Sequence, residues 1–209
     1  MKLYYFETPN PRKPCAVAKY LDAPVEWVRV DLTKGEHKSP EFLAINPNGK
    51  VPALQDGGTA LWESHAIMVY IAQLAGSELW PQDNARQIEI LKWFMWDIAH
   101  FSRHASTLYF QYYIKPTFGM GEPDADLIEE ASGFFKQFAS VLEQHLDGRE
   151  YLVADSLSVA DFAVASMLPT AAEAQLPLDD FPQIKRWHDQ LLTLPAWKDP
   201  FPARAAQAA

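Results

Sequence analysis

The spacing of apolar residues changes partway along the chain, close to Gln82. Before that point, short apolar or alternating runs typical of strands are separated by stretches with helical spacing. We predict strands at 2–6, 25–31, 51–55 and 60–62, and helices at 11–21, 40–44 and 64–74. The resulting order, βαβαββα, indicates a mixed sheet with helices on its faces.

After Gln82 the pattern is helical throughout. One long helix is predicted to bury a stripe made of Ile88, Leu91, Met95, Ile98, Ala105 and Leu108. A second is predicted to bury Leu127, Ala131, Phe134, Phe135, Phe138 and Leu142. Residues 158–172 are apolar nearly all round and are expected at the centre of a bundle. The predicted organisation is an α/β domain at 1–80, a linker at 81–84 and an all-helical domain at 85–209 with an irregular end.

The predicted central helix begins with a capping motif. Ser158 is followed three residues later by Asp161, a capping-box pattern with Asp in place of the usual Glu or Gln. We interpret Asp161 as a structural cap, because the free N–H groups of a buried helix end need partners. The alternative interpretation is a catalytic acid.

Composition excludes several classes of function. The net charge is −9 and no run of Lys and Arg occurs, which argues against a nucleic-acid partner. No apolar run approaches the roughly 18 residues of a membrane span, so no membrane association is expected. The N-terminus has no signal pattern, and the single cysteine, Cys15, cannot form an internal disulfide. These features predict a compact cytoplasmic protein.

The chain around Pro52 and Ser64 carries the strongest functional signal. A proline at the start of a strand cannot donate to the ladder, so a bend there leaves the Val51 backbone available to an extended peptide. Glu63 and Ser64 fall at a predicted helix start, where free N–H groups favour a carboxylate. The pattern predicts a site for a small peptide that carries both an amine and a carboxylate.

Four strings in this order and spacing resemble the cytosolic glutathione transferases, especially the delta and theta classes and many bacterial members. The strings are Gly35-Glu-His-Lys-Ser-Pro-Glu-Phe-Leu43, Asn46-Pro-Asn-Gly-Lys-Val-Pro-Ala-Leu54, Ala60-Leu-Trp-Glu-Ser64 and Ser158-Val-Ala-Asp161. The resemblance covers the whole chain. It implies a thioredoxin-like domain followed by a helical bundle, a homodimer, glutathione as co-substrate, no metal, and a role in detoxification.

The resemblance also implies how glutathione is held. The Val51 backbone, beside a cis Pro52, would pair with the cysteinyl part, and Glu63 and Ser64 would hold the γ-glutamyl amine and carboxylate. His37 and Lys50 match positions that approach the glycyl carboxylate. The charges agree, because glutathione carries two carboxylates and one ammonium at neutral pH. A solvated loop histidine and a plain turn lysine are the alternatives for His37 and Lys50.

The family activates the glutathione thiol with a hydroxyl that follows the first strand, and Thr8 occupies that position. Thr8-Pro-Asn10 is similar to the Nu class, in which the Thr and Asn of this string contact the glutathione sulfur. Both side chains can donate a hydrogen bond, and Arg12 and Lys13 would add positive potential if they point inward. The alternatives are a loop hydroxyl for Thr8 and a helix N-cap for Asn10.

Cys15 is a second candidate for thiol chemistry. It lies inside the predicted helix, and no second cysteine completes a Cys-x-x-Cys pair. Lone helical cysteines are mostly buried packing residues, and we interpret Cys15 as one of them.

An aromatic stripe on the first long helix is the candidate site for a second substrate. Crowded aromatic rings that face a cleft suit an apolar electrophile, but the same residues also suit a core or a dimer interface. The candidates are Trp96, His100, His104, Tyr109 and Tyr113. The two histidines are not expected to bind a metal, because no Cys, Asp or Glu joins them at ligand spacing.

The predicted function is that of a glutathione transferase. The enzyme would bind glutathione, lower the pKa of its thiol and direct the thiolate at a hydrophobic electrophile, without a metal. The alternatives are glutathione-dependent reduction of a disulfide, which the Nu-like string implies, and a non-catalytic binding protein of the same fold.

Overall fold

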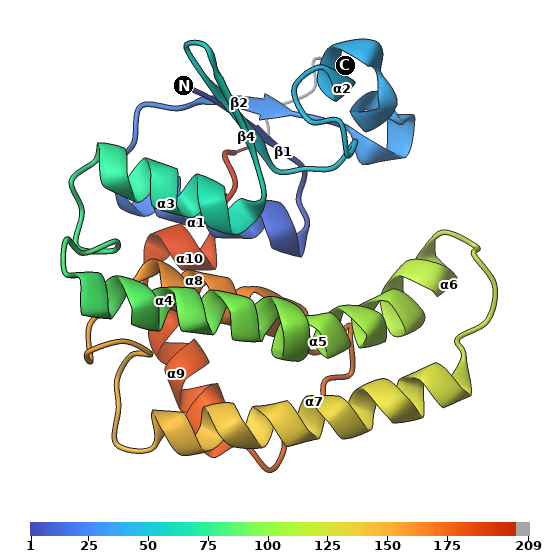
Figure 1. Ribbon diagram of the computed structural model, residues 1–209. Coiled ribbons are helices and arrows are strands. Elements are labelled where there is room, and N and C mark those ends of the chain that lie inside the picture. Colours follow the sequence, from blue (N-terminus) through green and yellow to red (C-terminus); the bar gives the residue numbers. More distant parts are fainter. Residues whose placement is uncertain (204–209) are drawn as a thin grey trace. The chain divides into compact units, whose positions relative to one another are not determined.

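The computed structural model describes residues 1–203, and its contacts divide the chain into two compact units (Figure 1). Within the described residues, the first unit comprises Met1–Trp80 together with 193–203. The second comprises Pro81–Leu192. The predicted end of the helical domain therefore differs from the observed grouping, because the segment after Leu192 packs with the first unit.

The first unit contains a four-stranded mixed sheet in the order β2-β1-β3-β4. Its strands are β1 (Lys2–Tyr5), β2 (Glu26–Arg29), β3 (Ala53–Asp56) and β4 (Thr59–Trp62). β1 pairs in parallel with β2 and antiparallel with β3, and β3 and β4 form the hairpin that the Asp-Gly-Gly turn predicts. The mixed sheet and the order βαβαββα are confirmed.

Helices cover this sheet. They are α1 (Pro9–Tyr20), α2 (Pro40–Leu43) and α3 (Ser64–Leu74), with short 3-10 turns η1 (Leu32–Lys34) and η2 (Glu36–Lys38) before α2. α1 and α3 pack against each other and bury their apolar faces (Figure 1). Phe42 of α2 packs in a separate cluster with Val30 and Ala53, around the ring of Tyr4. Because neighbouring residues of a strand point to opposite faces of the sheet, Leu3 and Tyr4 of β1 contribute to the packing on different faces.

The start of α1 differs from the prediction. The N-cap is Thr8, not Asn10, and α1 begins at Pro9. Prolines are tolerated at both Pro9 and Pro11, because the first N–H groups of a helix have no intrahelical partner. β3 likewise begins at Ala53, two residues later than predicted, since Pro52 cannot donate to the ladder.

The segment after Leu192 packs on α1 and forms hydrogen bonds with it. Helix α10 (Pro195–Lys198) packs on α1, where the Arg12 guanidinium donates to the carbonyl oxygen of Trp197. The same guanidinium lies 4.8 Å from the centre of the Trp197 ring, in a cation–π contact.

Two further contacts continue this attachment. The Lys19 ammonium donates to the carbonyl oxygens of Asp199 and Phe201, at 2.7 and 2.6 Å. The Phe201 ring stacks on Tyr5 of β1 with a centroid separation of 5.9 Å. Residues 200–203 are irregular, as predicted, and the rest of the Ala-rich tail lies outside the described residues.

The second unit is helical, with one isolated bridge between Val153 and Ser156. Its α-helices are α4 (Asn84–Trp96), α5 (Ser102–Tyr109), α6 (Lys115–Thr117), α7 (Ala125–Leu146), α8 (Val159–Val164) and α9 (Pro182–Leu192). Two π turns, η3 (Asp97–Phe101) and η4 (Phe110–Ile114), link α4, α5 and α6, and a 3-10 turn, η5 (Ala165–Thr170), extends α8. The predicted helical domain is confirmed in its fold class.

The predicted buried stripe of α4 is wrong. Ile88 and Met95 are 64% and 61% exposed, and Leu91 and Ile98 are exposed as well. α4 instead buries Ile90, Trp93 and Phe94, and the π turn η3 that continues it buries Asp97 and Phe101. Both sets have helical spacing, so the spacing alone does not decide which face meets the core. Ala105 and Leu108 are buried as predicted.

The second long helix shows the same ambiguity on a smaller scale. α7 buries Ala131, Phe135 and Leu142, as predicted. Leu127 and Phe134, from the same predicted stripe, are exposed. α7 buries Ala139 and Leu146 instead, so its buried face is rotated slightly from the predicted one.

Asp161 is fully buried at the start of α8 and accepts four hydrogen bonds. The Ser158 amide and hydroxyl donate to one carboxylate oxygen at 2.9 and 3.0 Å. The Leu152 amide and the Trp187 indole N–H donate to the other at 3.0 and 3.1 Å. Burial raises the pKa of Asp161 to about 6, and the four donors oppose the rise. The carboxylate is a capping-box residue, as predicted, and is closed off from substrate.

We expect Asp161→Ala to destabilise the protein by about 3–5 kcal/mol, because it leaves buried donors without an acceptor. Urea unfolding followed by circular dichroism measures the change. Asp189→Ala on α9, at an exposed position, is the control and should change the free energy of unfolding by less than about 0.5 kcal/mol. Equal effects of the two substitutions would contradict the structural role of Asp161.

Candidate functional site

Thr8 lies in the tight turn between β1 and α1. Its amide donates to the Phe6 carbonyl at 2.7 Å, and its hydroxyl lies 3.5 Å from the same oxygen. Its carbonyl accepts from the Arg12 amide, which starts α1. As the N-cap, Thr8 has extended backbone angles and its side chain makes no capping bond. The hydroxyl is thus held only by a long contact and can donate elsewhere.

Asn10 occupies the first turn of α1, and its side chain is exposed. Its amide oxygen accepts from the Lys13 ammonium at 3.0 Å. This bond engages the oxygen and leaves the NH₂ group as the donor that Asn10 can offer. The predicted cap role is wrong, because Thr8 holds that position.

The two basic residues of the first turn of α1 are engaged elsewhere. Arg12 is directed to Trp197, and Lys13 is almost fully buried beside Asn10. Burial lowers the pKa of Arg12 to about 10, although nearby Asp199 raises it. Arg12 is therefore engaged with the C-terminal segment, and the Lys13 ammonium beside Asn10 and the helix terminus are the sources of positive potential at this end of α1.

The turn before β3 is held by Asn46. The Val51–Pro52 bond is cis, as the resemblance implies. The buried Asn46 side chain donates to the Lys50 carbonyl at 2.6 Å and accepts from the Asn48 amide at 3.1 Å. Val51 thus lies outside the sheet ladder on a turn that a buried side chain fixes.

Glu63 is the N-cap residue of α3, and Ser64 is the first helical residue, as predicted. Glu63 has φ = 72°, an uncommon conformation for a residue other than glycine, and its side chain is exposed. Ser64 is buried. An exposed carboxylate and a free helix N-terminus are therefore adjacent, which suits a ligand that carries a cation next to an anion.

His37 and Lys50 lie on the loops that flank α2. His37 is half-buried in η2, and its Nδ1 has no hydrogen-bond partner among the described residues. Lys50 is exposed. A third basic group, not singled out from the sequence, is Lys38. Its ammonium lies beside Gly49, on the turn that precedes Lys50 and Val51. Its place directly after His37 is the sequence signal that could have identified it.

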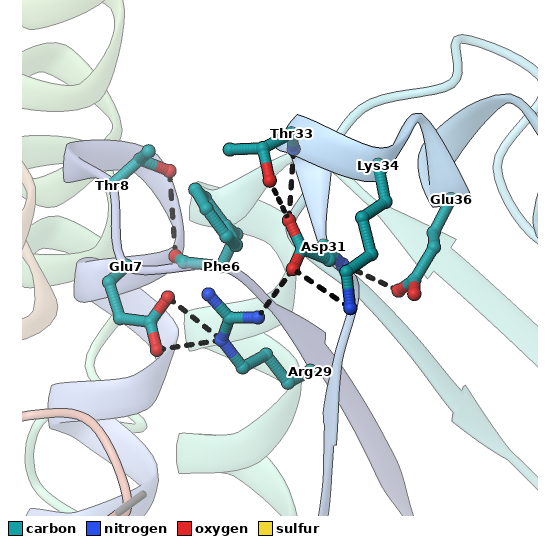
Figure 2. A network of polar contacts seen from close by, with 8 residues as sticks. All are labelled: Phe6, Glu7, Thr8, Arg29, Asp31, Thr33, Lys34 and Glu36. Atoms are coloured by element: carbon teal, nitrogen blue, oxygen red, sulfur yellow. Dashed lines mark hydrogen bonds and ion pairs between the residues drawn. The ribbon is translucent and has the colours of Figure 1, made fainter. Parts of the chain in front are cut away.

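An ion-pair network beside Thr8 was also missed (Figure 2). The Arg29 Nε lies 2.9 and 3.0 Å from the two carboxylate oxygens of Glu7, and Nη1 lies 3.2 Å from Asp31. The guanidinium also lies 4.6 Å from the centre of the Phe6 ring. Hydrogen bonds from Thr33 and from Arg29 lower the pKa of Asp31 to about 2. Period-2 alternation places Arg29 and Asp31 on one face, but nothing local indicates Glu7.

Cys15 is fully buried in α1. Burial raises the pKa of its thiol far above neutrality, with a further increase from Glu7 that Lys19 opposes. The thiolate is the reactive form, so Cys15 is an inert packing residue. This agrees with the interpretation of the sequence.

The predicted aromatic stripe separates into two groups. His100 stacks on Phe138 at 4.5 Å, and His104 stacks on Phe134 at 4.9 Å, so both rings pack on α7. Trp96 also meets Phe138, edge to face at 6.5 Å. Trp96, His100 and His104 thus make the contacts of packing residues, which was the alternative to a substrate site.

Tyr109 and Tyr113 form the second group. Their rings stack on each other at 5.1 Å, across the start of the π turn η4. Burial raises the pKa of Tyr109 to about 12, with a smaller contribution from Tyr113. Tyr109 is thus a neutral hydroxyl at physiological pH, and Tyr113 is 38% exposed.

Two negative findings concern residues 1–203. No group of three or more His, Cys, Asp or Glu side chains there is arranged to hold a metal ion. No helix in the same part of the chain combines the length and the apolar character that crossing a membrane requires.

Comparison with known proteins identifies the family. Residues 1–73 match the family described as "Glutathione S-transferase, N-terminal domain", and residues 101–195 match "Glutathione S-transferase, C-terminal domain". The chain belongs to the glutathione S-transferase family.

Individual relatives cover nearly the whole chain. Glutathione S-transferase 3 of Zea mays is 36% identical over 207 residues, which are 95% of this chain and 91% of that protein. A glutathione S-transferase-I solved with lactoylglutathione is 30% identical, with a TM-score of 0.85 over 95% of this chain and 97% of that one. A Pseudomonas fluorescens family member solved with two glutathiones bound is 28% identical, with a TM-score of 0.86 over 95% and 91%.

Proposed function

We propose that this protein is a glutathione transferase that binds glutathione on its first unit and activates the thiol for attack on a hydrophobic electrophile. One observation carries the proposal. The Val51–Pro52 turn outside the ladder occurs in one compact unit with Glu63 and Ser64 at a helix start. Family members with this fold have been solved with glutathione bound, which supports the same ligand here.

Each part of glutathione has a matching group. The Val51 backbone would pair with the cysteinyl residue, as an extended peptide pairs with a strand edge. The Glu63 carboxylate would hold the γ-glutamyl ammonium, and Ser64 with the α3 N-terminus would hold its carboxylate. Lys50 and His37 would meet the glycyl carboxylate.

Thr8 is our candidate for thiol activation. Pro9 and Pro11 have no N–H, so the α1 terminus offers fewer backbone donors than an ordinary helix start. The Thr8 hydroxyl and the Asn10 amide group therefore become the main donors available to a sulfur near this end of α1. A donor that favours the thiolate lowers the thiol pKa from about 8.5 toward neutrality.

In the transferase reaction, the glutathione thiolate attacks an electrophilic carbon. A new S–C bond forms and the leaving group departs with the electron pair of its bond, without a metal. We place the electrophile near Tyr109 and Tyr113 of the helical unit, with Trp96, His100 and His104 as supporting residues packed on α7. We also propose a cytoplasmic location, consistent with one buried cysteine.

Disulfide reduction is the second candidate function. The Thr8-Pro-Asn10 string is similar to the Nu class, and we propose that the chain is a bacterial member with this character. The free NH₂ group of Asn10 supports the proposal, because it can donate to a sulfur that leaves a disulfide.

We also propose a homodimer. Ile88, Leu91 and Met95 of α4, with Ile98 of the adjoining turn η3, form an exposed apolar stripe. Their spacing of three, four and three residues is that of a seam between two helices. Leu127, Phe134 and Val141 add exposed apolar positions on α7 at seven-residue spacing. A second copy of the chain is the occupant that both stripes favour, because a soluble monomer rarely leaves such rows uncovered.

We expect Glu63→Ala to weaken glutathione binding by about tenfold or more, because it removes a charged hydrogen-bond partner. Thr8→Ala should change the affinity by less than about threefold but raise the pKa of the bound thiol by about one unit. Calorimetry measures the affinity, and thiolate absorbance against pH measures the pKa. Glu41→Ala, at an exposed position on α2, is the control and should match wild type. Unchanged affinity in Glu63→Ala would refute the binding site, and an unchanged pKa in Thr8→Ala would remove its role.

The two candidate reactions are separated by assaying an aryl halide and a small disulfide side by side. If the protein is a Nu-like reductase, Asn10→Ala should lower disulfide reduction by about tenfold and conjugation by less than about threefold. Only the reduction has a leaving sulfur from the substrate disulfide, to which the Asn10 amide would donate. Equal losses in both reactions would contradict a specific role for the Asn10 amide in reduction.

We expect the double variant Met95→Glu/Ile98→Glu to be a folded monomer, because carboxylates in an apolar seam lose hydration without gaining partners. Sedimentation velocity gives the oligomeric state, and far-ultraviolet circular dichroism checks the fold. Gln137→Glu, which adds a charge at an exposed position on α7, should leave the dimer intact. A monomeric wild type, or a dimeric double variant, would refute this interface.

A further inference from the structure

Among the four asparagines of the chain, only Asn48 is followed by glycine. This pair is the one in which an asparagine most readily loses its amide, because glycine has no Cβ to obstruct the reaction. The Gly49 nitrogen would attack the side-chain carbonyl carbon of Asn48 and close a cyclic imide, and the NH₂ group would leave with the Gly49 hydrogen as ammonia. Water then opens the imide to aspartate or isoaspartate. A neutral amide becomes a carboxylate without an oxidant or a reductant.

The other three asparagines lack this neighbour. Asn10 and Asn46 are each followed by proline, whose nitrogen carries no hydrogen and cannot close the imide. Asn84 is followed by alanine, in the first turn of α4, where it is exposed. The sequence therefore restricts rapid deamidation to Asn48, which is also exposed.

In the folded turn, Asn46 holds both of the groups that would react. The Gly49 amide, which would attack, donates to the Asn46 carbonyl oxygen at 2.9 Å. The Asn48 side-chain NH₂, which would leave, donates to Asn46 Oδ1 at 3.0 Å, and the Asn48 backbone amide donates to the same atom at 3.1 Å. Asn46 itself is only 2% exposed. Closure of the imide requires that these hydrogen bonds break first.

Gly49 is also confined by its surroundings. It is buried, and the Lys38 ammonium, the His37 carbonyl and the Leu43 side chain lie directly around its Cα. The backbone between Asn48 and Gly49 must rearrange for the nitrogen to reach the side-chain carbon, and these neighbours oppose the rearrangement. The closed turn thus slows the reaction, and local opening of the turn permits it.

The product does not fit the closed turn. Asn46 accepts from Asn48 with its side-chain oxygen and donates to the Lys50 carbonyl at 2.6 Å with its NH₂ group. A carboxylate at position 48 has no hydrogen to donate, so its bond to Asn46 is lost. Rotating the Asn46 amide to meet the carboxylate would turn its oxygen toward the Lys50 carbonyl, which is also an acceptor. Isoaspartate adds a carbon to the backbone and displaces Gly49 as well.

We propose that Asn48 is a latent modification site: Asn46 protects it in the closed turn, and its deamidation irreversibly loosens the turn that precedes Val51. The consequence for ligand binding rests on the proposed function, in which the Val51 backbone holds the cysteinyl part of glutathione. A ligand that binds only the closed turn stabilises it, so bound glutathione slows the modification.

The rate of the modification tests the protection by Asn46. The full-length protein is incubated at mildly alkaline pH and physiological temperature, and peptide mapping by mass spectrometry follows the conversion of each asparagine. We expect the chain unfolded in guanidinium chloride to convert Asn48 at least about tenfold faster than the folded wild type. Folded Asn46→Ala, which loses the side-chain bonds to Asn48 and Lys50, should convert it about three- to tenfold faster than wild type. Asn84 is the internal control and should stay unmodified over the same period.

The effect on the proposed glutathione site is measured with the product itself. Asn48→Asp reproduces the aspartate form, and we expect its affinity for glutathione in calorimetry to be about three- to tenfold lower. Asn84→Asp, the same substitution at an exposed position on α4, should bind like wild type. S-methylglutathione at about ten times its dissociation constant should slow the conversion of Asn48 in wild type by about fivefold or more.

The rates decide the chemical part of the proposal. An unfolded chain in which Asn48 stays intact would remove the modification site. Equal rates in folded and unfolded wild type, or a folded Asn46→Ala protein that converts Asn48 at the wild-type rate, would overturn the protection. If Asn46→Ala does not fold, Asn46→Asp, which cannot donate to the Lys50 carbonyl, replaces it with the same expectation.

The binding experiments decide the link to glutathione. Wild-type affinity in Asn48→Asp would overturn the effect on the site, and so would S-methylglutathione that binds without slowing the conversion. If wild type does not bind glutathione at all, the proposed function fails. The protection of Asn48 by Asn46 is then still decided by the rates of conversion alone.

Discussion

The helical unit depends on one buried carboxylate. Asp161 gathers donors from three segments: the loop at Leu152, the cap at Ser158 and the indole of Trp187 on α9. Burying a charge is costly, and here four hydrogen bonds offset the loss of water. The bonds fix where α8 begins, and α4 packs directly on α8. Helix α4, which carries Trp96 and the exposed residues Ile88, Leu91 and Met95, therefore packs on an element whose start is fixed by a buried aspartate.

In the first unit, proline decides where backbone donors are missing. Pro9 and Pro11 lack two of the N–H groups that a helix start usually presents, and Pro52, directly before β3, lacks the N–H group that would extend this strand. Side chains then supply what the backbone lacks. The hydroxyl of Thr8 is the donor beside the shortened helix terminus, and Asn46 holds the turn that leaves Val51 outside the ladder. The same residue type thus shapes both ends of the proposed glutathione site.

Most of the fold and part of the site could be predicted from the sequence. The succession of strands and helices along the first unit and the start of α3 at Ser64 followed from local patterns, because the residue types that end and begin elements act over a few positions. The cap of α1 was misplaced, since Thr8 and Asn10 are both good caps and each is followed by proline. The buried face of α4 was also misassigned, because both faces are apolar. Arg29 was missed because its partner Glu7 lies 22 residues away and meets it only when β1 and β2 pair.

The attachment of the C-terminal segment to α1 affects how the chain is completed during synthesis. Arg12 and Lys19 are made early, but Trp197 and Phe201, whose carbonyls they bind, are added 185 and 182 residues later. While the ribosome works, α1 is exposed where α10 will later lie, and the first unit closes only after the residues of the helical unit and α10 have emerged. Removing the α10 segment would therefore be felt in the unit that contains β1 and α1. The first unit is begun before the helical unit is made and completed after it.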